Sequence, residues 1–274
     1  MEIEILDRND HKLTFVISGI SIEMVNAVRR IISSEVPAFA IDEVIILKND
    51  SPLYDEIIAH RLGLIPLKTS LEKYNLPQYC ESCGGYGCPL CQVSLTCEIT
   101  NDTNKSLVIY SGDLKSNDPE IIPVNDKIPI VKIDKGSSII FEAYAVLGRA
   151  TQHVKWSAVS NCAYRFYPVI EFNENEIKDN QEMELIVKLC PEKLYSISNK
   201  KLKLKEDYWQ KCTLCKACEE NSEGKINVSW KDDTYIFTLE SDGVLPFETI
   251  INKTFEIFTE KINEFVTKLE ELSI

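Results

Sequence analysis

The sequence predicts an α+β fold, and three features of its hydrophobic pattern point to that class. Apolar residues recur at helical spacing over 22–35 and again over 53–64, which predicts two short helices. The region 68–154 instead has short β-branched runs separated by glycine and proline, as in strands and turns. The closing segment 246–272 steps its apolar residues by three or four, which predicts one long amphipathic helix. Helices and strands are thus segregated along the chain rather than alternating.

The first half of the chain divides at turn and helix-stop signals. Residues 2–18 are expected to form a hairpin whose turn is the polar stretch 7–10. The first helix starts after Ser21, a residue type favoured at N-caps, and ends before Pro37, which cannot continue a helix. The β-branched segment 40–47 is expected to form a buried strand.

The second helix lies between two prolines, and the β-rich region follows it. Ile57, Ile58 and Leu62 are expected to pack against the first helix. Further strands are predicted over 93–99, 128–133, 138–146 and 161–172. Cys97 lies on the apolar face of the first of these strands and is expected to be a core residue.

Composition restricts the class of protein. With 274 residues and a net charge of −13, the chain lacks the clustered basic surface that broad nucleic-acid binding needs. The N-terminus does not resemble a signal peptide, and no apolar run approaches a membrane span. A cytoplasmic protein without membrane contact is therefore expected. Ten cysteines in such a compartment favour metal binding over a disulfide framework.

One cysteine motif has the spacing of an iron-sulfur site. Cys212, Cys215 and Cys218 follow one another at intervals of three, and the distant Cys190 precedes a proline, as in bacterial-type ferredoxins. This predicts one [4Fe-4S] cluster, or a [3Fe-4S] cluster if one ligand is displaced. Zinc is the alternative, because four thiolates also suit tetrahedral zinc.

The other motif consists of two short thiol knuckles joined by a glycine-rich turn. Its four cysteines are Cys80, Cys83, Cys88 and Cys91. Glycines permit the tight backbone that brings four sulfurs around one ion. Zinc is the preferred interpretation, and disulfides or an empty reduced loop remain open.

Neither motif indicates catalysis. Both sets are complete in ligands, whereas a hydrolytic zinc site keeps a position for water. The sequence has no P-loop, no His-Glu-x-x-His, no Gly-x-Ser-x-Gly and no dinucleotide glycine fingerprint. The long closing helix would span ~40 Å, so part of its stripe is expected to face another chain. The alternative is that it wraps its own sheet.

An ordered set of residues over 26–66 resembles a known family. The residues are Asn26, Arg29, Arg30, Ala40, Val44, Asn49, Ser51, Asp55, Glu56, Ile58, Ala59 and the run 61–66, Arg-Leu-Gly-Leu-Ile-Pro. Their order and spacing are similar to those of the D subunit of archaeal RNA polymerase, which is related to the third-largest subunit of eukaryotic RNA polymerase II and to the bacterial alpha subunit. The resemblance extends through both cysteine segments and the closing helix.

The resemblance implies a fold with three parts. Residues 1–39, 157–185 and 225–274 would form an alpha-subunit-like dimerisation domain. Residues 40–156 would form an inserted β-rich domain with the four-cysteine loop, which is similar to the zinc loop of the eukaryotic relative although its internal spacing differs. Residues 186–224 would form a ferredoxin-like insert that some archaeal D subunits retain. The insert has little apolar sequence of its own, so cluster binding should supply much of its folding energy.

The resemblance also implies a non-catalytic assembly platform within a nucleotidyltransferase complex. The chain would form a heterodimer with small subunit L, and the pair would recruit small subunits N and P and then the two large catalytic subunits. The interface with L would be built by the first helix and by the closing helix, with Phe247, Ile251, Phe258 and Phe265 on its stripe.

The polar residues of the two short helices would then face the second-largest subunit or hold the two helices in register. They are Arg29, Arg30, Asp55, His60 and Arg61, and Asn26 lies on the first helix, which is assigned to the interface with L. The alternative for these charges is an internal salt bridge from Asp55 or Glu56 to an arginine, worth little if exposed. The competing function is a ferredoxin-like electron carrier or a redox or iron sensor, which would need an exposed cluster and a redox partner.

Overall fold

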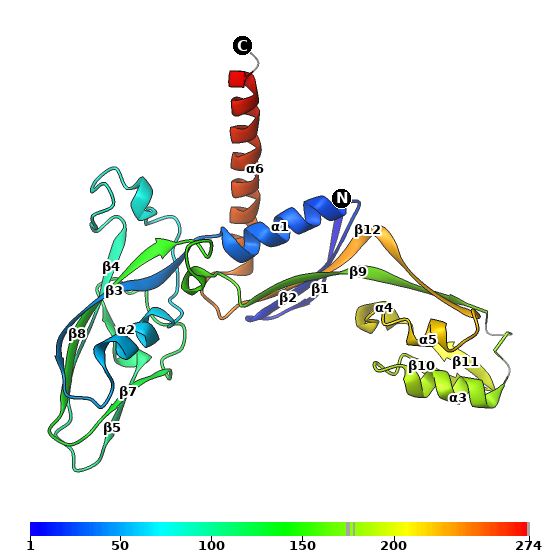
Figure 1. Ribbon diagram of the computed structural model, residues 1–274, viewed down its shortest axis with the longest axis horizontal. Helices are drawn as coiled ribbons and strands as arrows, with labels where there is room; N and C mark the ends of the chain where they lie inside the picture. The colour runs from blue at the N-terminus through cyan, green and yellow to red at the C-terminus, as the bar shows by residue number, and fades with distance from the viewer. Residues whose placement is uncertain (174–175, 178, 273–274) are drawn as a thin grey trace. The chain divides into compact units, whose positions relative to one another are not determined.

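Figure 1 shows the computed structural model, which describes residues 1–173, 176–177 and 179–272. The chain divides into two compact units, each built from separate segments. The first unit comprises Met1–Asp7, Thr14–Val25 and Ala163–Thr238, and the second comprises Arg8–Leu13, Asn26–Cys162 and Leu239–Ile274. The predicted mixture of helices and sheets is confirmed. Within the described residues, no helix is both long enough and apolar enough to cross a membrane.

A four-stranded sheet forms the centre of the first unit. Its strand order is β1 (Glu2–Arg8), β2 (Lys12–Ser18), β12 (Ile226–Glu240) and β9 (Asn161–Phe172). The predicted hairpin is confirmed in β1 and β2. Aromatic side chains pack across the strands: the rings of Phe15 and Phe237 stack with centroids 5.3 Å apart, and Tyr164 meets Tyr235 edge-on at 5.7 Å.

A small subdomain follows β9 in the first unit. It contains α3 (Asn180–Leu189), the hairpin of β10 (Tyr195–Ser198) and β11 (Lys201–Leu204), α4 (Tyr208–Lys211) and α5 (Ala217–Glu220). Its core includes Met183, Ile186 and Leu202 together with Ile170 of β9 and Ile226 of β12. The subdomain therefore takes part of its apolar core from the larger sheet.

The second unit is built on an antiparallel sheet of β3 (Ala38–Asn49), β8 (Ser138–Gly148), β4 (Gln92–Thr100) and β6 (Lys115–Ser116), in that order. Ala38 pairs with Gly148 and Gln92 with Val146, which sets the register. A separate ribbon joins β5 (Leu107–Tyr110) to β7 (Pro129–Ile133). Short 3-10 turns lie at η1 (Pro77–Tyr79), η2 (Ser111–Asp113) and η3 (Val154–Trp156).

Two expectations for this unit were wrong. Helix α2 (Asp55–Gly63) buries Ile58 and Leu62 in the core of the β3-β8-β4 sheet, with Phe39 and Phe141, rather than against the first helix. Strand β3 is buried only over its first four residues, and Leu47 is 72% exposed. The reason is that the second half of β3 alternates: Val44 and Ile46 pack against the core, whereas Ile45 and Leu47 lie on the opposite, exposed face, as in an antiparallel sheet with one face toward solvent. Cys97 is fully buried in this core, as predicted.

The predicted first and last helices are confirmed as α1 (Ile22–Ser34) and α6 (Phe247–Leu272). Lys261 of α6 forms a 2.6 Å ion pair with Glu35, next to the end of α1. Helix α6 buries Phe247, Ile250, Thr254 and Ile257, whereas every residue from 259 to 272 is exposed. The helix therefore packs within its unit only over its first half.

Candidate metal centres and partner-binding surface

Four cysteines converge in the loop between η1 and β4. The Sγ atoms of Cys80 and Cys88 are 3.6 Å apart, as are those of Cys83 and Cys91, and Cys88 and Cys91 are separated by 3.8 Å. All four ligand atoms lie within 4.8 Å of one another. Tetrahedral bonds of 2.3 Å would place sulfurs about 3.8 Å apart. The geometry therefore fits one four-coordinate metal ion, and we call this group the loop cysteines.

The local backbone explains why these sulfurs meet. The N–H of Gly84 donates to the carbonyl of Cys80 at 2.9 Å, and the N–H of Cys91 donates to the carbonyl of Cys88 at 3.0 Å. Each knuckle is thus a closed turn. Gly85 and Gly87 between them have φ of +93° and +96°, a region that side chains other than glycine rarely adopt.

The loop thiols differ in their tendency to ionise. Burial opposes ionisation of Cys83, but the N–H of Gly85 and the neighbouring thiols outweigh it, so its pKa falls to about 7. Burial raises the pKa of Cys91 to about 12. A cation among the four sulfurs would supply the positive charge that stabilises four thiolates together.

The second cysteine set lines one cavity in the first unit, and we call it the insert cysteines. Cys190 follows α3, Cys212 follows α4, Cys218 lies in α5, and Cys215 lies between the last two helices. All four contribute to the wall of the cavity. Cys190, Cys212 and Cys218 are buried, whereas Cys215 is exposed.

The insert cysteines are held farther apart than the loop cysteines. In the described part of the chain, the four loop cysteines have all of their ligand atoms within 4.8 Å of one another. The insert cysteines do not meet this distance criterion. The insert cysteines still interact electrostatically. Burial raises the pKa of Cys212, and the negative charges of the other three cysteines raise it further. Leu214 and Lys216, with φ of 56° and 59°, turn the backbone sharply between the ligands.

Strand β9 anchors residues 208–218, which carry Cys212, Cys215 and Cys218 and which we call the ligand loop. Arg165 Nη1 donates to the carbonyl oxygen of Cys212 at 2.7 Å, and Nη2 donates to that of Gln210. The ring of Tyr167 stacks on Trp209 with centroids 5.1 Å apart and planes 17° apart. The sequence did not predict either contact. Arg165 and Tyr167 lie more than 40 positions before the residues that they contact, and the alternating pattern of β9 indicates only a strand.

The polar residues predicted to bind partners lie on α1 and α2. Asn26 Oδ1 accepts from Arg29 Nε at 3.2 Å and from Nη2 at 3.1 Å, which orients that guanidinium. Arg30 is exposed. Arg61, also exposed, donates to the carbonyl of Pro129 at 3.0 Å.

The salt bridges proposed as the alternative for these charges do not form. Asp55 accepts a 2.7 Å hydrogen bond from Asn49 Nδ2. Among the ion pairs of the described residues, neither Asp55 nor Glu56 pairs with an arginine. His60 is exposed on the same helix.

The predicted stripe of α6 changes character along the helix. Phe247 is buried, Ile251 and Phe258 are half-buried, and Phe265 is 63% exposed. The apolar residues of the second half that are at least 44% exposed are Ile262, Phe265, Val266, Leu269 and Leu272. We call these five residues the distal α6 stripe.

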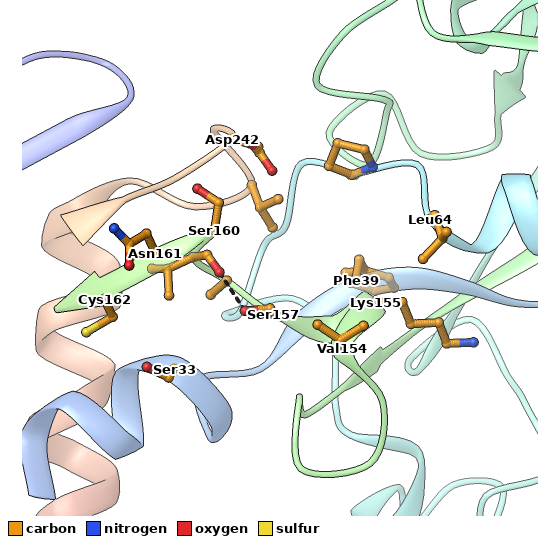
Figure 2. Close-up of a pocket in the computed structure, with 14 residues that line it drawn as sticks. Ser33, Phe39, Leu64, Val154, Lys155, Ser157, Ser160, Asn161, Cys162 and Asp242 are labelled. Carbon is orange, nitrogen blue, oxygen red and sulfur yellow. Dashed lines mark hydrogen bonds between the residues drawn. The ribbon is translucent and has the colours of Figure 1, made fainter.

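Figure 2 shows a cavity of about 400 Å³ in the second unit, between the end of α1, the start of β3 and the segment 154–162. Two of its polar side chains, those of Lys155 and Ser157, have polar partners in the chain. Lys155 Nζ pairs with Asp42 at 2.6 Å, and Ser157 Oγ donates to the carbonyl of Val159 at 2.6 Å. These two side chains are therefore engaged within the protein.

Comparison with known proteins decides the family. The chain is 37% identical over 276 residues to the DNA-directed RNA polymerase subunit Rpo3 of Methanosphaera stadtmanae, covering 99% of each chain. It is 36% identical to Rpo3 of Methanosarcina acetivorans over 274 residues, again covering 99% of each chain, and 34% identical to Rpo3 of Pyrococcus furiosus over 282 residues, covering 100% of this chain and 98% of the relative. The chain belongs to the Rpo3 family of RNA polymerase subunits.

The family model for the RNA polymerase Rpb3/RpoA insert domain matches residues 41–169 of this Rpo3 family member. That range begins in β3, includes the loop cysteines and ends in β9. The three-part division into dimerisation domain, inserted domain and ferredoxin-like insert remains a prediction. The competing function, an electron carrier or iron sensor, receives no support from these relatives.

Proposed function

We propose that this chain is the non-catalytic platform on which an RNA polymerase assembles. It pairs with small subunit L, and the pair recruits small subunits N and P and then the two large catalytic subunits. The observation that supports this most directly is the distal α6 stripe, because its five apolar side chains on one half of one helix are 44–81% exposed. Exposed apolar patches of this kind mark protein interfaces.

The interface with L uses α1 together with α6, with Phe247, Ile251, Phe258 and Phe265 along the α6 stripe. Phe247 and its buried neighbours fix the start of α6 in the second unit, and Phe265, 63% exposed on the second half of the helix, would contact the partner. Burying one such side chain contributes roughly 1.5–3 kcal/mol. A few of them would therefore account for a stable heterodimer.

A contact with the second-largest subunit uses the charged and polar residues of α1 and α2. This set is Arg29, Arg30, Asp55, His60 and Arg61, and Asn26 orients one of its members. The hydrogen bonds from Arg29 to Asn26 hold its guanidinium in one orientation, which lowers the entropy cost of a bidentate contact with a carboxylate.

Charge substitution on α6 tests the L interface. Phe265→Asp combined with Leu269→Asp should lower the affinity for L at least 100-fold, because two apolar contacts are lost and two charges are placed in the interface. Asn263→Asp is the matched control, since it adds a charge on an exposed position of the same helix. Isothermal titration or co-purification measures the result. Equal binding by the double variant and the control rejects α6 as the interface.

A second substitution separates the two partner surfaces. Arg30→Ala should weaken capture of the large subunit and leave the pair with L intact, because Arg30 is exposed and has no ion-pair partner among the described residues. Reconstitution from purified subunits, followed by size-exclusion chromatography, gives both readings. Normal assembly of the complete enzyme rejects this role.

We also propose the identity of each metal. Zinc suits the loop cysteines because their sulfur separations agree with a tetrahedral Zn–S₄ site. An iron-sulfur cluster suits the insert cysteines, because two sulfurs bound to one zinc lie at most about 4.6 Å apart and this set is more open. A [4Fe-4S] cluster uses Cys190, Cys212, Cys215 and Cys218, and displacement of the exposed Cys215 leaves a [3Fe-4S] cluster.

Metal and sulfide analysis tests these assignments. The chain is purified without oxygen in complex with its partner, and iron, zinc and acid-labile sulfide are measured per chain. About four iron with equal sulfide and one zinc are expected. Two zinc with no sulfide would reject the cluster and leave the assembly function intact.

A further inference from the structure

One buried hydroxyl in the cavity of the insert cysteines has no partner. Tyr195 opens β10 and is 3% exposed, and its Oη has no hydrogen-bond partner among the described residues. Buried tyrosine hydroxyls normally find a partner, because an unpaired one loses its bonds to water without replacement. Tyr195 also lines the cavity whose wall contains the four insert cysteines.

The cavity of this hydroxyl is lined by thiols, apolar side chains and a few other polar side chains. Ile170, Leu194 and Val228 are apolar residues beside the four cysteines, and Glu192, Thr213 and Lys216 are the other polar ones. The polar groups that act on the phenol are thiols: after burial, the interactions with Cys218 and then the charges of Cys190 and Cys212 raise the pKa of Tyr195.

The ring of Tyr195 is held in place from outside the cavity. Phe172, in the last position of β9, meets it edge-on with centroids 6.1 Å apart. The backbone N–H of Leu194, the preceding residue, donates to Cys190 Sγ at 3.4 Å. The chain at 194–195 therefore presents both a backbone donor and a side-chain donor to the sulfur ligands.

We propose that Tyr195 donates its phenolic hydrogen bond to the sulfur of Cys218 when the cluster is bound, and that this bond raises the reduction potential of the cluster. The inference rests on the proposed iron-sulfur cluster. One-electron reduction adds negative charge, part of which resides on the ligand sulfurs. A hydrogen bond to a sulfur stabilises the reduced form more than the oxidised form.

The test compares reduction potentials of the full chain in complex with its partner subunit. Redox titration with dithionite and mediators is followed by optical bleaching and electron paramagnetic resonance. Tyr195→Phe removes only the donor and should shift the potential to a more negative value. Replacement of Tyr195 by 3,5-difluorotyrosine keeps the ring and strengthens the donor, and should shift it to a more positive value. Tyr208→Phe is the control, because Tyr208 packs on the same core but does not line the cavity.

The outcomes separate this inference from the cofactor assignment. Opposite shifts in the two Tyr195 variants, with no shift in Tyr208→Phe and normal iron and sulfide in all three, support the hydrogen bond. Equal potentials in proteins that all retain their clusters overturn it and leave the cluster assignment standing. If Tyr195→Phe loses iron, the difluorotyrosine protein decides alone, and an unchanged potential there overturns the inference. Wild-type protein without iron and sulfide overturns both proposals.

Discussion

Replacing Asp118 with asparagine should destabilise the segment that leads into the loop cysteines. The carboxylate of Asp118 is buried, accepts a 2.6 Å bond from Lys73 Nζ and another from the hydroxyl of Tyr74, and accepts the N–H of Glu120 at 3.0 Å. Tyr74 in turn packs edge-on against Phe39, with ring centroids 5.0 Å apart. One carboxylate thus joins residues 73–74 to the loop after β6.

The magnitude follows from the pKa of this carboxyl. The hydrogen bonds from Lys73 and then Tyr74 outweigh burial and lower it from 3.8 to about 2. Each pKa unit corresponds to about 1.4 kcal/mol, so ionised Asp118 contributes at most about 2.5 kcal/mol. Because the Lys73 side chain is 51% exposed, solvent screening reduces this to roughly 1–2 kcal/mol.

The pH dependence has a definite sign. Because the folded pKa is lower than the unfolded one, the contribution is fully present above about pH 4 and is lost as the pH falls toward 2. The asparagine side chain of the variant does not titrate. The stability difference between wild type and Asp118→Asn should therefore be roughly 1–2 kcal/mol at pH 7 and about half of that at pH 3.

Hydrogen exchange measured by mass spectrometry is the appropriate assay, because a chain with two units need not unfold in one step. Peptides from β4 and from 68–79 report on this region. Glu120→Gln is the matched control. It also removes one negative charge, but from an exposed side chain two residues after Asp118. A difference between Asp118→Asn and wild type that stays constant from pH 7 to pH 3 would refute the reasoning.

Three further predictions concern the loop of the insert cysteines, the core of the second unit and the buried thiol of Cys97. Arg165→Ala removes two hydrogen bonds to carbonyl oxygens of the ligand loop, including that of Cys212. It should destabilise residues 208–218 by roughly 1–3 kcal/mol, which hydrogen exchange measures. Unchanged protection of these residues would contradict the anchoring role of β9. Leu62→Ala should lower the free energy of unfolding of the second unit by roughly 2–5 kcal/mol in urea, because Leu62 is fully buried. A decrease below about 1 kcal/mol would show that this core rearranges to fill the cavity. Cys97, buried and with its pKa raised by burial to about 12, should resist iodoacetamide in the folded chain after chelators expose the loop cysteines; rapid labelling of Cys97 would mean that metal loss unfolds the unit.

Sequence patterns were most reliable where the signal is local. The spacing of the loop cysteines and their glycines predicted a set of thiols that the structure brings within 4.8 Å, because knuckle turns form from neighbouring residues. The helical period over 246–272 predicted α6 with an error of one residue. Stop signals at Pro37 and Pro66 likewise placed the ends of α1 and α2 closely.

Predictions failed where the outcome depends on which elements meet. The apolar residues of α2 could serve any apolar partner, and only the fold shows that Ile58 and Leu62 face the β3-β8-β4 sheet. The apolar run of β3 suggested burial on both faces, but only one face of its second half packs on the core, and Leu47 lies on the exposed face. Asp118 gave no signal either, since a lone aspartate between strands is typical of a turn.

The sequence by itself determined the class of the chain, the order of its main elements and the two sets of thiols, because helical period, turn residues and ligand spacing act over a few residues. Only the tertiary structure decided which groups support those thiols and which surfaces are exposed. The roles of Arg165, Tyr195 and the distal α6 stripe follow from where the fold places them relative to residues far apart in the chain. Packing selects those contacts, and a single sequence does not specify them residue by residue.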